Sequence, residues 1–521
     1  MNTLRLIDLI MNKRLTIRLI ILMIAAISFA CCSSRPTSIP EYYTDVADSA
    51  IIYPDYCGVT IPPNIAPLNF MVTDTLADSF VADINGVICG ATNDGKFDID
   101  STAWRRLLVD NRGKDIQVTI YAHRQQKWLR HPSFTISVAE EDIDPYVTYR
   151  LIEPGYELYF QLGIYQRNLT NFDVNTIYEN NRDHNAKEPH CINCHNFQNN
   201  DADRMYLHVR ENYKGTVFTN GKEAHKIMIK HDSILASGAY GHWHPTLPLV
   251  AYSTNLTQQV FHMHYPEKIE VYDRGSDLLF YDVEHNSVRH ILRTSDHFET
   301  FPCWSADGTR LYYCDARLPE FEYENFDASL VMHYDSLFYD LYSIPFDTLT
   351  YTFGEPRLEV NASAMGLSCS VPRFSPDGRY LSYALAKYGQ FHLYHKSSDL
   401  WMQDLTQPHE SLLPTENSYP LTATNSDNSE SYHSWSSNSR WIVFSSRRED
   451  NDYTRSYIAY IDRLGQGHKA FLLPQRDPEY NLLLMKSFNV PELTRNAISV
   501  SRSTMNHVIL NTEAELATYE E

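Results

Sequence analysis

The stretch VPRFSPDGRYLSYALA, residues 371–386, decides the fold of this chain. At its centre the S-P-D-G turn of residues 375–378 has Pro to set φ, Asp to hydrogen-bond the local backbone, and Gly to accept a positive φ. Beyond the turn, Leu381 and Tyr383 are two residues apart, so both side chains point to one face of a strand. The stretch therefore predicts an antiparallel hairpin that buries the aromatic ring of Phe374.

Three more stretches align with this one without gaps: YGHWHPTLPLVAYSTN from residue 240, FPCWSADGTRLYYCDA from 301 and YHSWSSNSRWIVFSSR from 432. Each has an aromatic residue at its fourth position, and a second strand pair follows each hairpin. Four strands per unit, repeated at this spacing, predict the blades of a β-propeller. A single such sheet has two faces to bury, so the blades must close into a ring. With weaker strand pairs at 147–175 and 205–230, the count becomes five or six.

The rest of the chain supports an all-β fold with a second, smaller domain. Residues 56–150 carry short alternating strands between turn signals, which is typical of a small β-sandwich. We therefore divide the 521 residues into a signal peptide, a tether, a β-sandwich, a propeller and a tail. The signal peptide is expected at residues 1–30, the tether at 31–55, the β-sandwich at 56–150, the propeller at 151–480 with an insert at 181–212, and the tail at 481–521.

The first thirty residues predict export. Lys13, Arg14 and Arg18 precede an apolar run from residue 19 to 30, which is too short to cross a bilayer and suits a secretory signal. Cys31 directly after Ala30 resembles the lipidated cysteine of a lipoprotein, although Ser28 stands where such sites usually have Leu. We expect a protein of the periplasm or outer membrane that meets the membrane through this lipid only; plain secretion is the alternative.

Composition excludes several functions. The formal charge is −21 at pH 7, and the removed segment is basic, so the mature protein would repel phosphate backbones and no nucleic-acid partner is expected. The sequence has no G-x-S-x-G elbow, no H-E-x-x-H and no phosphate-binding Gly-rich loop. A hydrolase or nucleotide enzyme is therefore not expected.

The chemistry-bearing motif is C-x-x-C-H in KEPHCINCHNF, residues 187–197, which reads as a polar loop. In an exported protein, Cys191 and Cys194 can bind the vinyl groups of haem as thioethers while His195 ligates the iron. This predicts one covalent haem c per chain. A disulfide between the two cysteines, or a zinc site that adds nearby histidines, are the alternatives.

The sequence does not decide which residue, if any, is the sixth ligand of the haem iron. Met205 and His208 follow the motif closely enough to cover the other haem face, and Met would raise the reduction potential relative to His. A five-coordinate iron is the third possibility. Arg210 could pair with a haem propionate or form a surface salt bridge. The H-W-H and H-M-H pairs at 242–244 and 262–264 are better explained as ordinary strand residues.

The hairpins resemble the repeats of TolB-like six-bladed propellers. The runs SESYHSWSSNSRWIVFSSRRED from 429, LLPQRDPEYN from 472 and KSFNVPEL from 486 resemble a family of secreted TolB-related proteins of the Bacteroides group. That resemblance covers roughly residues 57–497. Members are often labelled cytochrome c biosynthesis proteins. The label reflects the haem-like motif, and no biosynthetic activity is carried over from it.

Three functions follow from these patterns. The first is electron transfer or redox sensing by a haem-bearing, lipid-anchored propeller, which implies a redox partner protein. The second is a binding scaffold for an envelope protein complex, in which the C-x-x-C-H segment is a disulfide or zinc staple. The third is an enzyme with an open haem position. Fold alone does not separate them.

Overall fold

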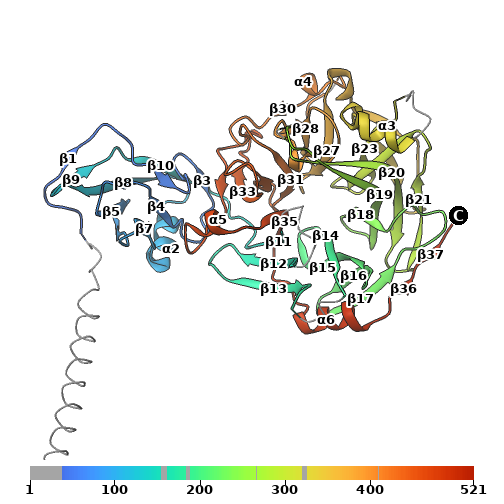
Figure 1. The fold of residues 1–521 in the computed structure, drawn as a ribbon, viewed down its shortest axis with the longest axis horizontal. Coiled ribbons are helices and arrows are strands. Elements are labelled where there is room, and N and C mark those ends of the chain that lie inside the picture. The colour runs from blue at the N-terminus through green and yellow to red at the C-terminus, as the bar shows by residue number, and fades with distance from the viewer. Residues whose placement is uncertain (1–37, 154–160, 183–187, 266, 320–325, 409) are drawn as a thin grey trace, which may run out of the picture.

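The computed structural model describes residues 38–153, 161–182, 188–265, 267–319, 326–408 and 410–521 (Figure 1). The predicted signal peptide and the predicted lipidation site Cys31 lie outside these residues. In the described part of the chain, six sheets of four or five strands surround one axis, and a smaller two-sheet domain lies beside them. The prediction of an all-β chain with a propeller of five or six blades is confirmed, and the count is six.

Each blade runs antiparallel from an innermost strand outward. From the axis outward, blade 1 consists of β35 (Ser487–Thr494), β11 (Tyr146–Ile152), β12 (Gly163–Asn168) and β13 (Val174–Glu179). Blade 2 consists of β14 (His190–Gln198), β15 (Asp201–Glu211), β16 (Gly215–Asn220) and β17 (Glu223–Met228). Blade 3 consists of β18 (Gly238–Trp243), β19 (Leu249–Phe261), β20 (Ile269–Asp282) and β21 (Ser287–Leu292). Blade 4 consists of β22 (His297–Trp304), β23 (Arg310–Arg317), β24 (Asp340–Asp347), β25 (Thr352–Phe353) and β26 (Arg357–Val360). Blade 5 consists of β27 (Ser368–Phe374), β28 (Tyr380–Ala386), β29 (Asp399–Asp404) and β30 (Tyr419–Pro420). Blade 6 consists of β31 (Glu430–Trp435), β32 (Trp441–Ser446), β33 (Arg455–Tyr460) and β34 (Phe471–Leu472).

The ring is closed by the end of the chain. Strand β35 comes after blade 6 in sequence, but it pairs with β11 and becomes the innermost strand of blade 1. The innermost strands then contact one another in the order β35, β14, β18, β22, β27 and β31, and β31 returns to β35. Blade 1 is thus built from both ends of the propeller sequence. The predicted tail of residues 481–521 is wrong, because this segment supplies a strand that closes the ring.

The last residues add further structure. Helix α6 (Arg502–Asn511) begins at Ser501, whose side chain accepts a hydrogen bond from the Thr504 amide, and it packs against β13 and β17. Two short strands, β36 (Glu515–Leu516) and β37 (Thr518–Tyr519), pair in parallel with β17 and β21. The C-terminus therefore covers the outer edges of blades 2 and 3.

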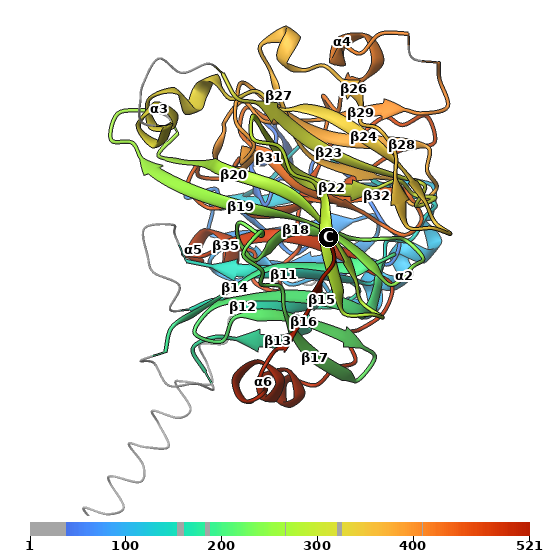
Figure 2. The same ribbon diagram turned by 90° about the vertical axis from the view of Figure 1, so that its right-hand side faces the viewer.

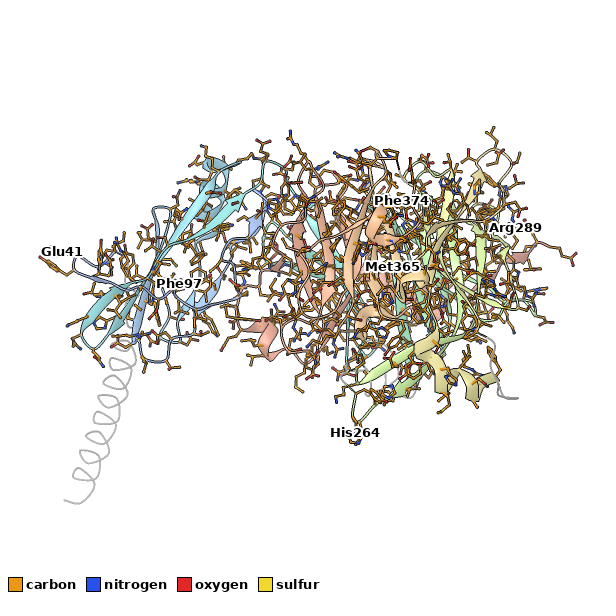
Figure 3. The ribbon with its side chains drawn as sticks, turned by 90° about the horizontal axis from the view of Figure 1, so that it is seen from above. Glu41, Phe97, His264, Arg289, Met365 and Phe374 are labelled. Carbon is orange, nitrogen blue, oxygen red and sulfur yellow. The ribbon has the colours of Figure 1, made fainter. Side chains whose placement is uncertain are left out.

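The N-terminal domain holds a seven-stranded and a three-stranded sheet among the described residues. The larger sheet contains β1 (Thr44–Asp45), β3 (Thr60–Ile61), β5 (Ser79–Ile84), β6 (Val87–Gly90), β8 (Asp115–Arg124), β9 (Lys127–Arg130) and β10 (Phe134–Val138); the smaller contains β2 (Ile52–Tyr53), β4 (Phe70–Val72) and β7 (Lys96–Phe97). Helix α2 (Ser101–Asp110), which was not predicted, is capped by Asp100. Figure 3 shows Glu41 and Phe97 in this domain at one end of the molecule. The predicted tether is partly wrong, because β1 and β2 belong to the sheets.

One hydrophobic core joins the two domains. Trp104 and Ile120 of the N-terminal domain belong to the same buried cluster as Trp441 of β32 and Phe488 of β35. The indole of Trp441 also donates to the Glu141 carbonyl at 3.2 Å, on the segment between the domains. The N-terminal domain is therefore held firmly against blades 1 and 6. Among the described residues, no helix is long and apolar enough to cross a membrane.

Candidate functional site

The propeller axis contains a chamber of about 500 Å³, here called the central chamber. Every blade contributes to its wall. Among the lining residues are Val490 from blade 1, His195 from blade 2, Tyr240 from blade 3, Phe301 from blade 4, Arg373 from blade 5 and Tyr432 from blade 6. This volume lies within the range of about 300–1,000 Å³ that small-molecule and cofactor sites occupy.

A repeated bulge shapes the chamber. Tyr240, Phe301, Val371, Tyr432 and Val490 occupy the same position in five innermost strands, and each has a φ between 46° and 50°. At each of these positions the register with the neighbouring strand shifts by a bulge. A bulge bends the strand and redirects its side chains. Of the five side chains, all but Val371 line the chamber.

The C-x-x-C-H motif lies on the innermost strand of blade 2, β14. Its register with β15 shifts between Asn193 and His195, so Cys194 holds the bulge position of this blade. The prediction of a polar insert at 181–212 is therefore wrong for the motif, because these residues form the first two strands of a regular blade. The sequence C-H-N-F at 194–197 is a further copy of Y-H-S-W at 432–435.

Alternation along β14 directs part of the motif to the chamber. Cys191, Asn193 and His195 are spaced by two and all line the chamber, while Ile192 packs in the cluster on the other face. Cys191 is half-buried and lies opposite Arg210 in the register. The side chain of Cys194 lies outside the described part of the structure. The structure thus brings two of the three predicted haem-binding residues, Cys191 and His195, to one wall.

His195 has the features of a metal ligand. Its side chain is buried, and the carbonyl of Thr148 accepts a hydrogen bond from the imidazole. Nε2 has no hydrogen-bond partner among the described residues. Burial, and secondly the charge of Arg150, lowers the pKa of His195 to about 3. The ring is therefore neutral at physiological pH, as a ligand must be.

Imidazole nitrogens without a hydrogen-bond partner among the described residues also occur elsewhere, at His208, His290, His392, His395 and His433. These do not lie at the chamber: among the described residues, His195 is the only histidine in its wall. His433 holds the equivalent position in blade 6, where its ring contacts the Ser382 hydroxyl at 2.9 Å. His195 differs from these other histidines because it lines the central chamber.

The sixth ligands expected from the sequence are not at the chamber. Met205 packs in the apolar cluster with Phe197, Leu207 and Met505, on the face of β15 away from it. The Nδ1 of His208 lies 3.0 Å from the Thr216 hydroxyl, and His208 is not among the lining residues. The expectation is wrong because residues 201–211 form a strand and not a loop that could fold over a haem. Alternation turns Met205 to the other face, and His208, although it shares the face of Arg210, contacts Thr216 and does not line the chamber.

The H-W-H pair is structural, as expected. His242 contacts the Cys303 sulfur at 3.8 Å, and His244 accepts hydrogen bonds from two backbone amides in the next turn. In the H-M-H pair, His262 lies 2.9 Å from the Tyr334 hydroxyl, and Figure 3 places His264 at the tip of the long β19–β20 hairpin. In Figure 2 this hairpin extends toward α3 (Phe326–His333). Among the described residues no three His, Cys, Asp or Glu side chains form a metal cluster.

A second, smaller chamber of about 120 Å³ lies on the same axis, beyond the bulges. It is lined by the residues that follow each bulge, including the aromatic fourth positions Trp243, Trp304, Phe374 and Trp435. Arg373 and Glu492 line both chambers. Glu492 accepts hydrogen bonds from Asn196 Nδ2 at 3.1 Å and from the Phe197 amide at 3.3 Å, so it joins β35 to the motif strand.

No protein-family model and no curated protein sequence matches the chain. Among solved structures it is similar to TolB from Acinetobacter baumannii, with 11% identity and a TM-score of 0.41 over 73% of this chain and 78% of that chain. An auxiliary nutrient binding protein from Bacteroides thetaiotaomicron has 8% identity and a TM-score of 0.32, over 81% and 99% of the two chains. A Synechocystis apocarotenoid oxygenase mutant has 10% identity and a TM-score of 0.34, over 86% and 97%. At these identities the likeness concerns the fold alone.

Proposed function

We propose that the central chamber holds one covalently attached haem c, and that the protein serves electron transfer or redox sensing. The observation that carries this proposal is His195: a buried, neutral imidazole in the wall of a 500 Å³ chamber, with Nε2 unpaired among the described residues. A bound haem would supply an iron that changes its oxidation state by one electron.

The chain's own residues would hold the group as follows. The Thr148 carbonyl fixes the tautomer of His195 and leaves Nε2 for the iron, which is the usual arrangement around a metal-bound histidine. Cys191, on the same wall, and Cys194, at the bulge of the same strand, would supply the thioether sulfurs. Because burial keeps the pKa of His195 near 3, protons do not compete for Nε2 at physiological pH.

Export and anchoring belong to the same proposal. Haem c is attached outside the cytoplasm, and residues 1–31 carry the predicted signal and the lipid-bearing Cys31. We place the protein in the periplasm or outer membrane, with a redox protein as partner, and among the TolB-related lipoproteins of Bacteroides-type bacteria. Its acidic charge suits a partner with a basic docking face.

The proposal is tested by haem that survives denaturing electrophoresis. The chain is produced in a host with haem-ligation machinery and stained for haem in the gel. We expect a stained band from the wild type, and none from the double variant Cys191→Ala/Cys194→Ala. Cys57→Ala, at a half-buried cysteine of the N-terminal domain, is the matched control and keeps the stain. Absence of stain in the wild type contradicts the proposal.

A second candidate is a binding scaffold without haem. It is favoured by the finding that C-H-N-F occupies the repeat position that Y-H-S-W fills in blade 6, so blade geometry alone accounts for part of the motif. In this case Cys191 and Cys194 form a disulfide or a zinc staple, and the chamber takes another ligand. Thiol titration of the unstained protein, with and without a reductant, separates the disulfide from the other forms.

A further inference from the structure

Three arginines from three blades line the central chamber. Arg150 lies on β11 of blade 1, Arg210 on β15 of blade 2, and Arg373 on β27 of blade 5. Blades 2 and 5 face each other across a six-bladed ring, so cations approach the chamber from opposite sides. The chain as a whole carries a charge of −21, so the positive charge of these three side chains is opposite to that of the molecule.

These arginines do not form ion pairs with carboxylates among the described residues. Arg448, for comparison, pairs with the buried Glu430 at 2.8 Å. Among the described residues, none of the three chamber arginines forms such an ion pair. Arg150 donates to the Ile192 carbonyl at 2.9 Å and to Asn193 Oδ1 at 2.6 Å, and its buried Nε has no partner in the described part. Arg373 donates to the Pro372 carbonyl at 2.8 Å.

The acids of the chamber offset this charge only in part. Glu153 and Glu492 line it, and the Glu492 oxygens already accept hydrogen bonds from Asn196 and the Phe197 amide. Burial raises the pKa of Glu492 to about 7 against the opposing effect of the nearby Arg373 charge, so the residue is partly protonated at neutral pH. Unpaired guanidinium groups in a partly enclosed space attract anions, because their charge is weakly screened there.

The remaining wall indicates which anion fits. Tyr240, Phe301, Phe391, Val271 and Val490 give the chamber a large apolar surface. Inorganic phosphate would leave this surface in contact with water, whereas an apolar body with carboxylate groups would cover it and still reach the arginines. The planar guanidinium fork matches a carboxylate with two parallel hydrogen bonds.

We infer that Arg150, Arg210 and Arg373 form a carboxylate-binding site of the central chamber, for a ligand with an apolar body. Two sources supply this chemistry: the propionates of an attached haem, and a free aromatic carboxylic acid. The assignment of haem propionates as the ligand rests on the proposed function. The carboxylate site does not rest on it, because the arginines bind carboxylates whether or not a thioether bond forms.

The test uses the full mature chain carrying Cys191→Ala/Cys194→Ala, which cannot attach haem. Its fluorescence is titrated with protoporphyrin IX, with the dimethyl ester of the same porphyrin, and with 2-naphthoate. Metal-free porphyrin removes any contribution of iron ligation by His195. The free acid is expected to bind at least about tenfold more tightly than the ester, because the ester lacks the negative charge and the two equivalent oxygens that a guanidinium group binds. Added salt should reduce the difference in affinity between the free acid and the ester, because salt screens the charges of the arginines and the carboxylates.

Variants assign the effect to the arginines. Arg210→Gln and Arg373→Gln should each weaken binding of the acid about tenfold and leave the ester unchanged. Arg106→Gln on the exposed face of α2 is the matched control and should change neither. Unchanged thermal unfolding midpoints confirm that the variants are folded. Binding of porphyrin but not naphthoate supports the haem source, and tight naphthoate binding supports a free acid.

Two results would overturn the inference: equal binding of acid and ester, or no loss in either arginine variant. These outcomes are separate from those of the haem stain. A chain that shows no covalent haem but prefers the acid keeps the carboxylate site and loses the proposed function. A chain that stains for haem but treats acid and ester alike keeps the function and loses the site.

Discussion

Glu492 offers a quantitative test of how the ring is closed next to the motif. This carboxylate lies on β35, only 8% of its surface is exposed, and it hydrogen-bonds Asn196 and the Phe197 amide on β14. Burial raises its pKa from 4.5 to about 7. The perturbation is Glu492→Gln, which keeps the size of the side chain and removes its titration.

The sign of the pH effect follows from the two states. Below pH 4.5 the residue is protonated in both the folded and the unfolded chain. Between pH 4.5 and 7 the unfolded chain releases this proton first, so the folded state binds more protons and its stability falls as the pH rises. Above pH 7 the loss is complete. The rise of the Glu492 pKa from 4.5 to about 7 corresponds to a total loss of about 3 kcal/mol of folding stability at high pH.

The assay is urea unfolding of wild type and Glu492→Gln, followed by tryptophan fluorescence at pH 5, 6, 7 and 8. The difference in unfolding free energy between the two proteins should move by about 2–3 kcal/mol in favour of the variant between pH 5 and pH 8. Any pH-independent cost of the amide cancels in this comparison, as do the other titrating groups. Glu416→Gln, on the exposed part of α4 (Pro414–Asn417), is the matched control and should show no trend. A constant difference between wild type and Glu492→Gln would refute the reasoning.

Three further predictions concern closure, the shared core and the motif. Deleting residues 487–521 removes β35, so the ring should not close; limited proteolysis should then degrade the propeller, and a resistant propeller would contradict this closure. Trp441→Ala should lower the unfolding free energy by about 3–5 kcal/mol, measured in urea, because the indole is fully buried. The half-buried Trp128→Ala should cost less, and an equal cost would count against a core shared by the domains. His195→Leu should retain the covalent haem stain but change the visible absorption spectrum, because the iron loses its nitrogen ligand; an unchanged spectrum would rule out His195 as that ligand.

Much of the fold could be predicted because the propeller repeats itself. Turn chemistry at residues 375–378 and the aromatic fourth positions mark four blades directly in the sequence. The remaining two blades give only weaker strand pairs, at 147–175 and 205–230, and their innermost strands give no signal for physical reasons. In blade 2 the bulge position is Cys194, and in blade 1 the innermost strand comes from residues 487–494, far from its partners in sequence. Pairing between distant segments leaves no local pattern.

The candidate site was predicted in part. Residue types and spacing identified the C-x-x-C-H motif, and the structure brings Cys191 and His195 to a common wall. The environment of the motif was mistaken for a loop because its polar residues face a chamber inside the ring. Aligning C-H-N-F with Y-H-S-W would have identified the strand. The convergence of Arg150, Arg210 and Arg373 had no signal in the sequence, since it depends on the closure of the ring.

Intact mass spectrometry of the exported protein, purified from a host that ligates haem, tests the central proposal most directly. A mass higher than that of the mature polypeptide by one haem, lost in the Cys191→Ala/Cys194→Ala variant, is the predicted result. An unmodified polypeptide mass from the same host would contradict a haem in the central chamber.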